Sequence, residues 1–145
     1  FRLDKDFENI VGIKEASGNI GVIETIVEGR KKGFKIYSGD DGTSMICSLL
    51  GADGCISVAC NIIPKEFAKM MELSLAGKAA EAREIHYKYR HLMDLLFVES
   101  NPIPVKAALA AMGMMKEEYR LPLCKMANEN KALLLAEMKK LGLIK

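Results

Sequence analysis

Short apolar runs alternate with amphipathic stretches in the first half of the chain. The runs cover about residues 10–14, 34–38 and 55–59, and glycine or polar residues bound each of them. Short runs that are apolar throughout are typical of strands buried on both faces. The stretches that follow each run carry apolar residues at helical spacing. The pattern therefore predicts an α/β fold with parallel strands and right-handed helical crossovers.

Turn residues indicate where the helices of this part begin and end. Asn19 is a candidate N-cap for a helix over about residues 20–32, and Gly33 is expected to end that helix. Asp41 is a candidate cap for a second helix that runs to about residue 50. Pro64 suits the first turn of a third helix.

From Gly77 onward the pattern indicates helices alone. Helices are predicted over about residues 78–97, 104–112 and 128–141. The prolines at positions 102 and 104 separate the first two, because the residue before a proline disfavours helical geometry. We therefore divide the chain into an α/β part, residues 1–77, and a C-terminal helical domain, residues 78–145.

Composition narrows the class of protein. The net charge is +2 and the charges are interspersed, so no nucleic-acid partner is indicated. No apolar run approaches the roughly 20 residues of a membrane span, so no membrane partner is expected. The four cysteines lack CxxC spacing and have apolar neighbours, which favours reduced thiols in the core of a cytoplasmic protein.

The first residue is Phe rather than Met, and residues 1–3 have the pattern of a helix tail. We therefore expect the chain to be a piece of a longer polypeptide. A short natural product processed at its terminus is the alternative.

A lysine closes the first apolar run. Burial at a strand end favours the neutral amine, and only that form attacks a carbonyl group. Lys14 could equally extend its ammonium group into solvent, so the residues alone leave both interpretations open. Ser38 and Gly39 end the second run, and Ile56 lies in the third. These residues are expected beside Lys14, because sites in parallel α/β folds lie at the carboxyl ends of the strands.

Two glycines and two histidines bear on the kind of site. Gly12 would leave room for a small substrate beside Lys14, and Gly39 would let the backbone approach a bound molecule. His86 and His91 lie five positions apart on one predicted helix, so their directions differ by roughly 140°. We therefore expect no metal site and interpret both histidines as helix-surface residues.

Residues 12–19, with the sequence GIKEASGN, resemble the Schiff-base strand of the dihydrodipicolinate synthase family. This family belongs to the pyruvate-dependent, N-acetylneuraminate-lyase-like class I aldolases. Later stretches agree with it in order and spacing: SGDD at 38–41, GADGCISV at 51–58, NPIPVK at 101–106 and RLPL at 120–123. The resemblance covers nearly the whole chain but only the C-terminal half of such an enzyme. It implies the last three βα units of a (β/α)8 TIM barrel followed by a C-terminal helical domain.

The resemblance also implies roles for individual residues. The lysine that matches Lys14 forms the imine with pyruvate, so Lys14 is the expected catalytic residue. Ile56 is expected to bind pyruvate, largely through its main chain, and Gly39 to lie near the second substrate. Asp40 and Asp41 are better interpreted as helix caps. No cofactor is implied, because the covalent imine with pyruvate supplies the chemistry.

The implied activity is that of a lyase that condenses pyruvate with aspartate semialdehyde in the biosynthesis of diaminopimelate and lysine. N-acetylneuraminate lyases and 2-keto-3-deoxy sugar acid aldolases share the lysine and remain alternatives. The implied partners are the N-terminal half of the same barrel and further copies in a homo-oligomer, a homotetramer. The family's proton relay belongs to that N-terminal half, so residues 1–145 alone are expected to be inactive. A non-catalytic module that self-associates through its open sheet edge is the alternative from another class.

Overall fold

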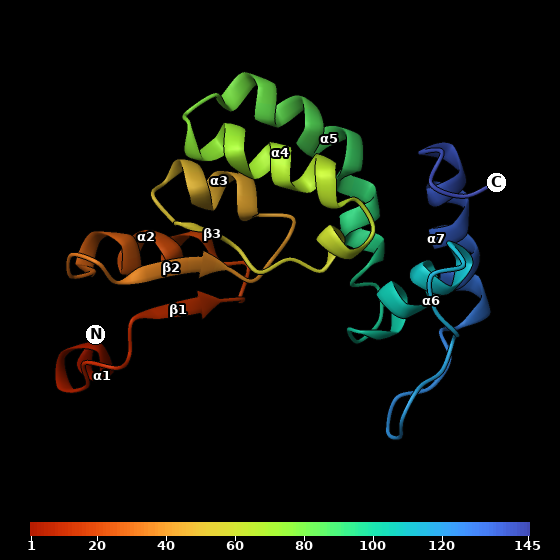
Figure 1. Ribbon diagram of the computed structural model, residues 1–145, viewed down its shortest axis with the longest axis horizontal. Coiled ribbons are helices and arrows are strands. Elements are labelled where there is room, and N and C mark those ends of the chain that lie inside the picture. Colours follow the sequence, from red (N-terminus) through yellow and green to blue (C-terminus); the bar gives the residue numbers. More distant parts are fainter. The chain divides into compact units, whose positions relative to one another are not determined.

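A three-stranded parallel sheet lies in the first part of the chain (Figure 1). A computed structural model describes residues 1–145. The strands are β1 (Gly12–Glu15), β2 (Lys35–Ser38) and β3 (Gly54–Cys55), in the order β1-β2-β3. Two helices connect them, α2 (Ile20–Gly29) and α3 (Ser44–Leu49). The predicted α/β class is therefore confirmed.

Helix α2 begins where the sequence predicts and ends earlier. The side chain of Asn19 accepts a hydrogen bond from Gly21 N at 3.0 Å, which confirms it as the N-cap. The last helical residue is Gly29, because Arg30 adopts an extended conformation. Gly33, the predicted end of the helix, instead lies in the turn before β2 with φ +93°. Only glycine adopts such a backbone conformation readily.

Strand β3 is shorter than predicted. It pairs with β2 only at Tyr37–Gly54 and Ser38–Cys55, whereas the sequence indicated a strand over residues 55–59. After Cys55 the chain leaves the sheet and forms the 3₁₀ helix η1 (Ala59–Asn61). The apolar run is therefore shared between a strand and a helical turn, which periodicity cannot distinguish over so few residues.

Ile36 is the centre of the core beside the sheet. Its side chain is fully buried, and it clusters with Ile23 of α2, Cys47 of α3 and Ala52. Burial of such an aliphatic side chain stabilises a fold by about 1.5–3 kcal/mol. This cluster packs α2 and α3 against one face of the sheet.

Strand β1 is not buried on both faces, contrary to the prediction. It is an edge strand, and its pairing partner is β2 alone. The side chains of Val11 and Ile13 are 66% and 38% exposed. An edge strand with exposed aliphatic side chains is a surface on which further structure can pack.

The remaining elements are helical. They are α1 (Arg2–Asp6), α4 (Pro64–Leu75), α5 (Ala79–Leu95), α6 (Ile103–Ala111) and α7 (Asn128–Lys140). Pro64 opens α4 as predicted, and Phe67 and Met70 on that helix are buried. None of the helices is long and apolar enough to cross a membrane.

The chain divides into two compact units. The first contains residues 1–57 and 65–86, and the second contains residues 58–64 and 87–145. The predicted boundary at Gly77 falls in the turn between α4 and α5, within the first unit. The division into domains at residues 77 and 78 therefore stays a prediction.

In the second unit, α6 and α7 pack on each other (Figure 1). Glu99 ties the segment before α7 in place, because its Oε1 accepts hydrogen bonds from Ala127 N and Asn130 Nδ2. Tyr119 donates to the carbonyl oxygen of Ile103 at 3.3 Å. Burial, followed by the nearby Glu117 carboxylate, raises the pKa of Tyr119 to about 12. The phenol therefore remains a neutral donor at physiological pH.

Asp53 joins the start of β2 to the turn before β3. Its carboxylate accepts hydrogen bonds from Ile36 N at 3.0 Å and Lys35 Nζ at 2.9 Å. It also pairs with Arg30 at 2.5 Å. Burial acts to raise the pKa of Asp53, but the hydrogen bonds from these donors outweigh it and leave that pKa below its ordinary value.

Replacing Asp53 by asparagine is expected to lower the free energy of unfolding by about 1.5–3 kcal/mol, the usual range for hydrogen bonds to a charged group. Because the pKa is lowered on folding, this stabilisation is present above the unfolded-state pKa of about 4. It is lost as the pH falls through the lower folded-state value. Thermal unfolding should show a larger difference between wild type and variant at pH 7 than at pH 3.

Asp94→Asn is the matched control for that measurement. Asp94 pairs with Arg90 on the surface of α5, and its side chain is 52% exposed. Such pairs contribute about 0.3–0.5 kcal/mol. Equal losses of unfolding free energy in the two variants would contradict the proposal that Asp53 stabilises the fold through its hydrogen bonds to β2.

Candidate active site

Lys14 lies on β1 opposite Tyr37 of β2, one residue before the end of the strand. Its side chain is exposed and its ammonium group forms no ion pair with a carboxylate. The structure therefore supports the interpretation in which Lys14 extends into solvent. An amine in this position is accessible to a small carbonyl compound.

Gly39 lies directly beneath the side chain of Lys14. A Cβ atom built on Gly39 would meet Lys14 Cε at 2.6 Å, Lys14 Cγ at 3.1 Å and Ala16 Cβ at 2.6 Å. The amide of Gly39 donates to the carbonyl oxygen of Glu15 at 2.6 Å. The absence of a side chain at position 39 is therefore what lets the aliphatic stem of Lys14 cross this turn.

The turn after β2 is held by its own side chains. Ser38 Oγ donates to the carbonyl oxygen of Asp40 and accepts from Asp40 N, at 2.9 and 3.2 Å. Asp40 Oδ1 accepts from both the amide and the hydroxyl of Thr43 at 2.8 Å. Asp40 therefore holds the turn that leads into α3, but the N-cap of that helix is Thr43, so the interpretation of Asp40 as a helix cap is wrong.

Asp41 does not cap α3 with its carboxylate, contrary to the prediction. Its carbonyl oxygen, rather than its side chain, accepts from Ser44 N and Ser44 Oγ. The Asp41 side chain is 1% exposed, and Cys55 Sγ lies 3.9 Å from its Oδ1. Sequence reasoning missed this buried carboxylate, although an acidic residue three positions after the end of a buried strand was a usable signal.

The turn after Lys14 is also self-supporting. Glu15 Oε1 accepts from Ser17 N, and Ser17 Oγ accepts from Asn19 N, at 2.9 and 3.1 Å. Asn19 then caps α2 through Gly21 N. Hydrogen bonds therefore run without interruption from the residue after Lys14 into the first turn of α2.

Gly12 does not leave room for a substrate, contrary to the prediction. A Cβ atom on Gly12 would approach the carbonyl oxygen of Lys35 to 2.7 Å. The space belongs to the backbone of β2. Gly12 is needed so that β1 and β2 can approach each other.

Ile56 follows β3 at the same edge of the sheet. Its amide donates to the carbonyl oxygen of Ser38 at 2.8 Å, and its side chain is 50% exposed. Lys14 and Gly39 are in contact. Gly39 directly follows Ser38, whose carbonyl oxygen accepts the hydrogen bond from the Ile56 amide. The sheet thus brings the three predicted site residues to one edge.

The histidines do not form a metal site. His91 is exposed, as predicted, but His86 is 8% exposed and therefore not a surface residue. It faces the interior because its position on α5 falls between buried residues of that helix, Ala82 and Tyr89. No group of three or more histidine, cysteine or acidic side chains could hold a metal ion.

The cysteines form no disulfide, but only part of the prediction for them holds. Cys47 is buried, and burial raises the pKa of its thiol. Cys60 and Cys124 are exposed, so the prediction that the cysteines lie in the core is wrong for these two. Cys60 lies in η1, and Cys124 lies in an irregular segment before α7.

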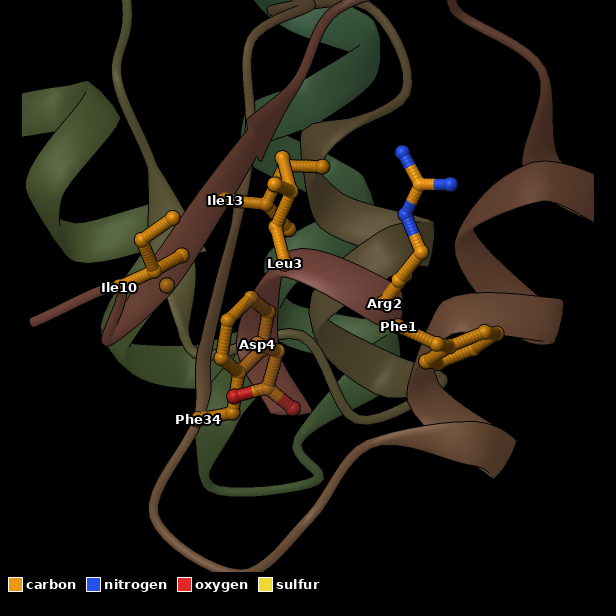
Figure 2. A pocket seen from close by; sticks show the side chains of 8 residues that line it. Phe1, Arg2, Leu3, Asp4, Ile10, Ile13 and Phe34 are labelled. Atoms are coloured by element: carbon orange, nitrogen blue, oxygen red, sulfur yellow. The ribbon is translucent and has the colours of Figure 1, made fainter. Parts of the chain in front are cut away.

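A pocket of about 410 Å³ lies beside β1 on another side of the strand (Figure 2). Apolar side chains dominate its lining, and Figure 2 shows Leu3 and Ile13 close together while Arg2 extends away from them. Successive side chains of a strand point to opposite faces. Ile13 therefore points toward this pocket and Lys14 points away from it, so the pocket does not serve the candidate site.

Comparison with known proteins places these features in a family. The model of the dihydrodipicolinate synthetase family matches residues 1–141. The chain is 46% identical over 143 residues to the 4-hydroxy-tetrahydrodipicolinate synthase of Chlorobaculum parvum, and the match covers 99% of this chain and 48% of that protein. The synthase of Hydrogenobaculum sp. is 43% identical over the same length. The chain thus spans about half the length of the curated relatives it matches.

Solved structures agree. Dihydrodipicolinate synthase from Aquifex aeolicus superposes with a TM-score of 0.95 at 42% identity, covering 98% of this chain and 48% of that one. The Acinetobacter baumannii enzyme, solved in complex with pyruvate, gives a TM-score of 0.90 at 40% identity, covering 94% and 47%. The backbone that carries Lys14, Gly39 and Ile56 is therefore shared with enzymes of known structure. The chain belongs to the dihydrodipicolinate synthetase family.

Proposed function

We propose that the chain supplies the imine-forming part of a 4-hydroxy-tetrahydrodipicolinate synthase, which condenses pyruvate with aspartate semialdehyde. The observation that carries this proposal is the accessible amine of Lys14, whose stem rests on Gly39 at the carboxyl edge of a parallel sheet. Sites of parallel α/β folds lie at that edge. The pyruvate complex of the Acinetobacter baumannii relative supports the choice of ligand.

The reaction begins with attack of the unprotonated Lys14 Nζ on the carbonyl carbon of pyruvate. A C–N bond forms, the carbonyl oxygen leaves as water, and the result is an imine. The imine withdraws electrons, so the methyl carbon of pyruvate loses a proton and an enamine forms. The enamine carbon then attacks the aldehyde carbon of the second substrate, whose oxygen takes up a proton, and the adduct is again an imine on Lys14. The amino group of the second substrate adds to the imine carbon, the C–N bond to Lys14 breaks, and the amine is restored as the product leaves. This sequence needs no metal ion or other cofactor.

Ile56 and Gly39 are the proposed substrate-binding residues. The Ile56 amide already donates to Ser38, so the main-chain group that remains is its carbonyl oxygen, which can accept from the N–H of the protonated imine between Lys14 and pyruvate. Gly39 follows β2 beside Lys14, where the second substrate must approach the enamine carbon.

The partner of this surface is the rest of a barrel. The relatives are about twice as long as this chain, and we propose that β1, β2 and β3 are the last three strands of a (β/α)8 barrel followed by a helical domain. The exposed Ile13 on the edge strand β1 and the exposed Val11 just before it favour a neighbouring strand there. The enzyme is expected to assemble as a homo-oligomer, a homotetramer.

N-acetylneuraminate lyases and 2-keto-3-deoxy sugar acid aldolases would use the same imine. The names of the relatives favour the synthase, since those reported above at 43–46% identity are 4-hydroxy-tetrahydrodipicolinate synthases. Consumption of pyruvate with aspartate semialdehyde, but not with N-acetylmannosamine or a sugar-derived aldehyde, would distinguish the synthase.

Borohydride reduction in the presence of pyruvate is expected to attach the reduced pyruvate to Lys14. The imine is the species that borohydride reduces, and Lys14 is the amine at the proposed site. Peptide mapping by mass spectrometry should find the modification on the peptide that contains Lys14. Modification of surface lysines such as Lys32 to the same extent would overturn the assignment.

A further inference from the structure

We propose that Gly39 is a positioning residue for the Lys14 amine: it fixes where the nucleophile stands, in addition to bordering the substrate. This inference rests on the proposed function, because it assigns the geometry of the same lysine. The sequence predicts that Gly39 lies near Lys14, but it does not predict that a side chain at position 39 would meet the stem of the lysine.

The contact leaves no room for even one methyl group. Ordinary van der Waals contact begins at 3.4 Å, whereas a Cβ on Gly39 would stand 2.6 Å from Lys14 Cε, so that contact would have to open by about 0.8 Å. The atom displaced is the carbon that bears the reactive nitrogen. A misplacement of about 1 Å in a reacting group can cost about 10²-fold in rate.

The turn beneath Lys14 cannot easily move instead. Gly39 N is tied to Glu15 O at 2.6 Å, and the residues on either side are tied together through Ser38 Oγ. Asp40 in turn is tied to Thr43. Lys14 Cε is the far end of a flexible side chain, so it is the group that yields.

Alanine itself is compatible with the backbone at this position. Gly39 is not among the glycines with positive φ, so an alanine there meets no backbone strain of that kind. The effect of an alanine at position 39 therefore comes from steric clashes with Lys14 and with Ala16.

The test compares Gly39→Ala with wild type in borohydride trapping of pyruvate, with Lys14 followed by peptide mapping. The maximal trapping rate at Lys14 is expected to fall about 10- to 100-fold. The pyruvate concentration that gives half-maximal trapping should stay within about twofold, because the nucleophile rather than the pyruvate site has moved. Gly21→Ala is the control, since its Cβ would meet only Asn19 Oδ1, at 3.3 Å.

The double variant Ala16→Gly/Gly39→Ala separates the two contacts and serves also if Gly39→Ala alone fails to fold. It removes the clash with Ala16 Cβ and keeps the clash with Lys14. Trapping that stays low in the double variant supports the positioning role, and trapping restored to the wild-type rate overturns it. Trapping in Gly39→Ala equal to wild type also overturns it. Wild-type protein that is not modified at Lys14 would instead refute the proposed function.

Discussion

Replacing Lys14 by arginine is expected to abolish both imine formation and condensation in the enzyme proposed above, while the protein stays folded. Arginine keeps the positive charge, but its guanidinium is not deprotonated at working pH and forms no imine with pyruvate. Removal of a catalytic nucleophile costs on the order of 10⁴–10⁶-fold in rate. Lys14 is exposed and unpaired with a carboxylate, so the free energy of unfolding should change by less than about 0.5 kcal/mol.

Turnover, pyruvate trapping and thermal unfolding are the measurements for this variant. Lys32→Arg is the matched control, because Lys32 is also exposed and lies in the same unit away from the site. The control should retain wild-type rates. Turnover of Lys14→Arg within tenfold of wild type would exclude the imine mechanism for this lysine.

Residues 1–145 expressed alone are expected to self-associate and to show no condensation. Val11, just before the edge strand β1, is 66% exposed and Ile13 on that strand is 38% exposed, and Ile56, which follows the opposite edge strand β3, is 50% exposed. Covering each such side chain is worth up to about 1.5–3 kcal/mol. Edge strands with apolar side chains are ready templates for pairing with another chain. Light scattering should therefore give a mass at least twice that of the monomer.

The matched variant is Val11→Lys with Ile13→Lys. Lysine on an edge strand opposes pairing between chains, so the variant should be closer to a monomer. Condensation should be absent in both, because the resemblance places the family's proton relay in the half of the enzyme that this chain does not match. A wild-type chain that is a compact monomer and condenses the two substrates would contradict the proposed division of labour.

The sequence was sufficient for those parts of the fold that local chemistry determines. Asn19 could be recognised as a cap because its side chain acts on the nearest turn, and Pro64 because its ring suits the start of a helix. The ends of β3 and the exposure of β1 were mispredicted. An apolar run has the same sequence pattern whether or not another segment packs on it. Val11 belongs to such a run and is nevertheless exposed, because no other segment covers it.

The candidate site was predictable only in part for a related reason. Lys14 could be named from its position after a strand and from resemblance. The role of Gly12 was mispredicted, since the atom that occupies the space beside it, Lys35 O, belongs to a strand more than 20 positions away. The contact between Gly39 and Lys14 is equally long-range in sequence, so no spacing rule could reveal it.

The hydrogen bonds after Lys14 have a consequence for the order of folding. Those that Glu15, Ser17 and Asn19 accept each join residues two positions apart, so forming them closes almost no loop. The hydrogen bond from Gly39 N to Glu15 O, in contrast, joins two residues that are separated by the whole of α2, so it closes a long loop. Contacts of low sequence separation form early and distant ones later. The turn that follows the lysine is therefore able to take shape before the lysine meets the glycine beneath it.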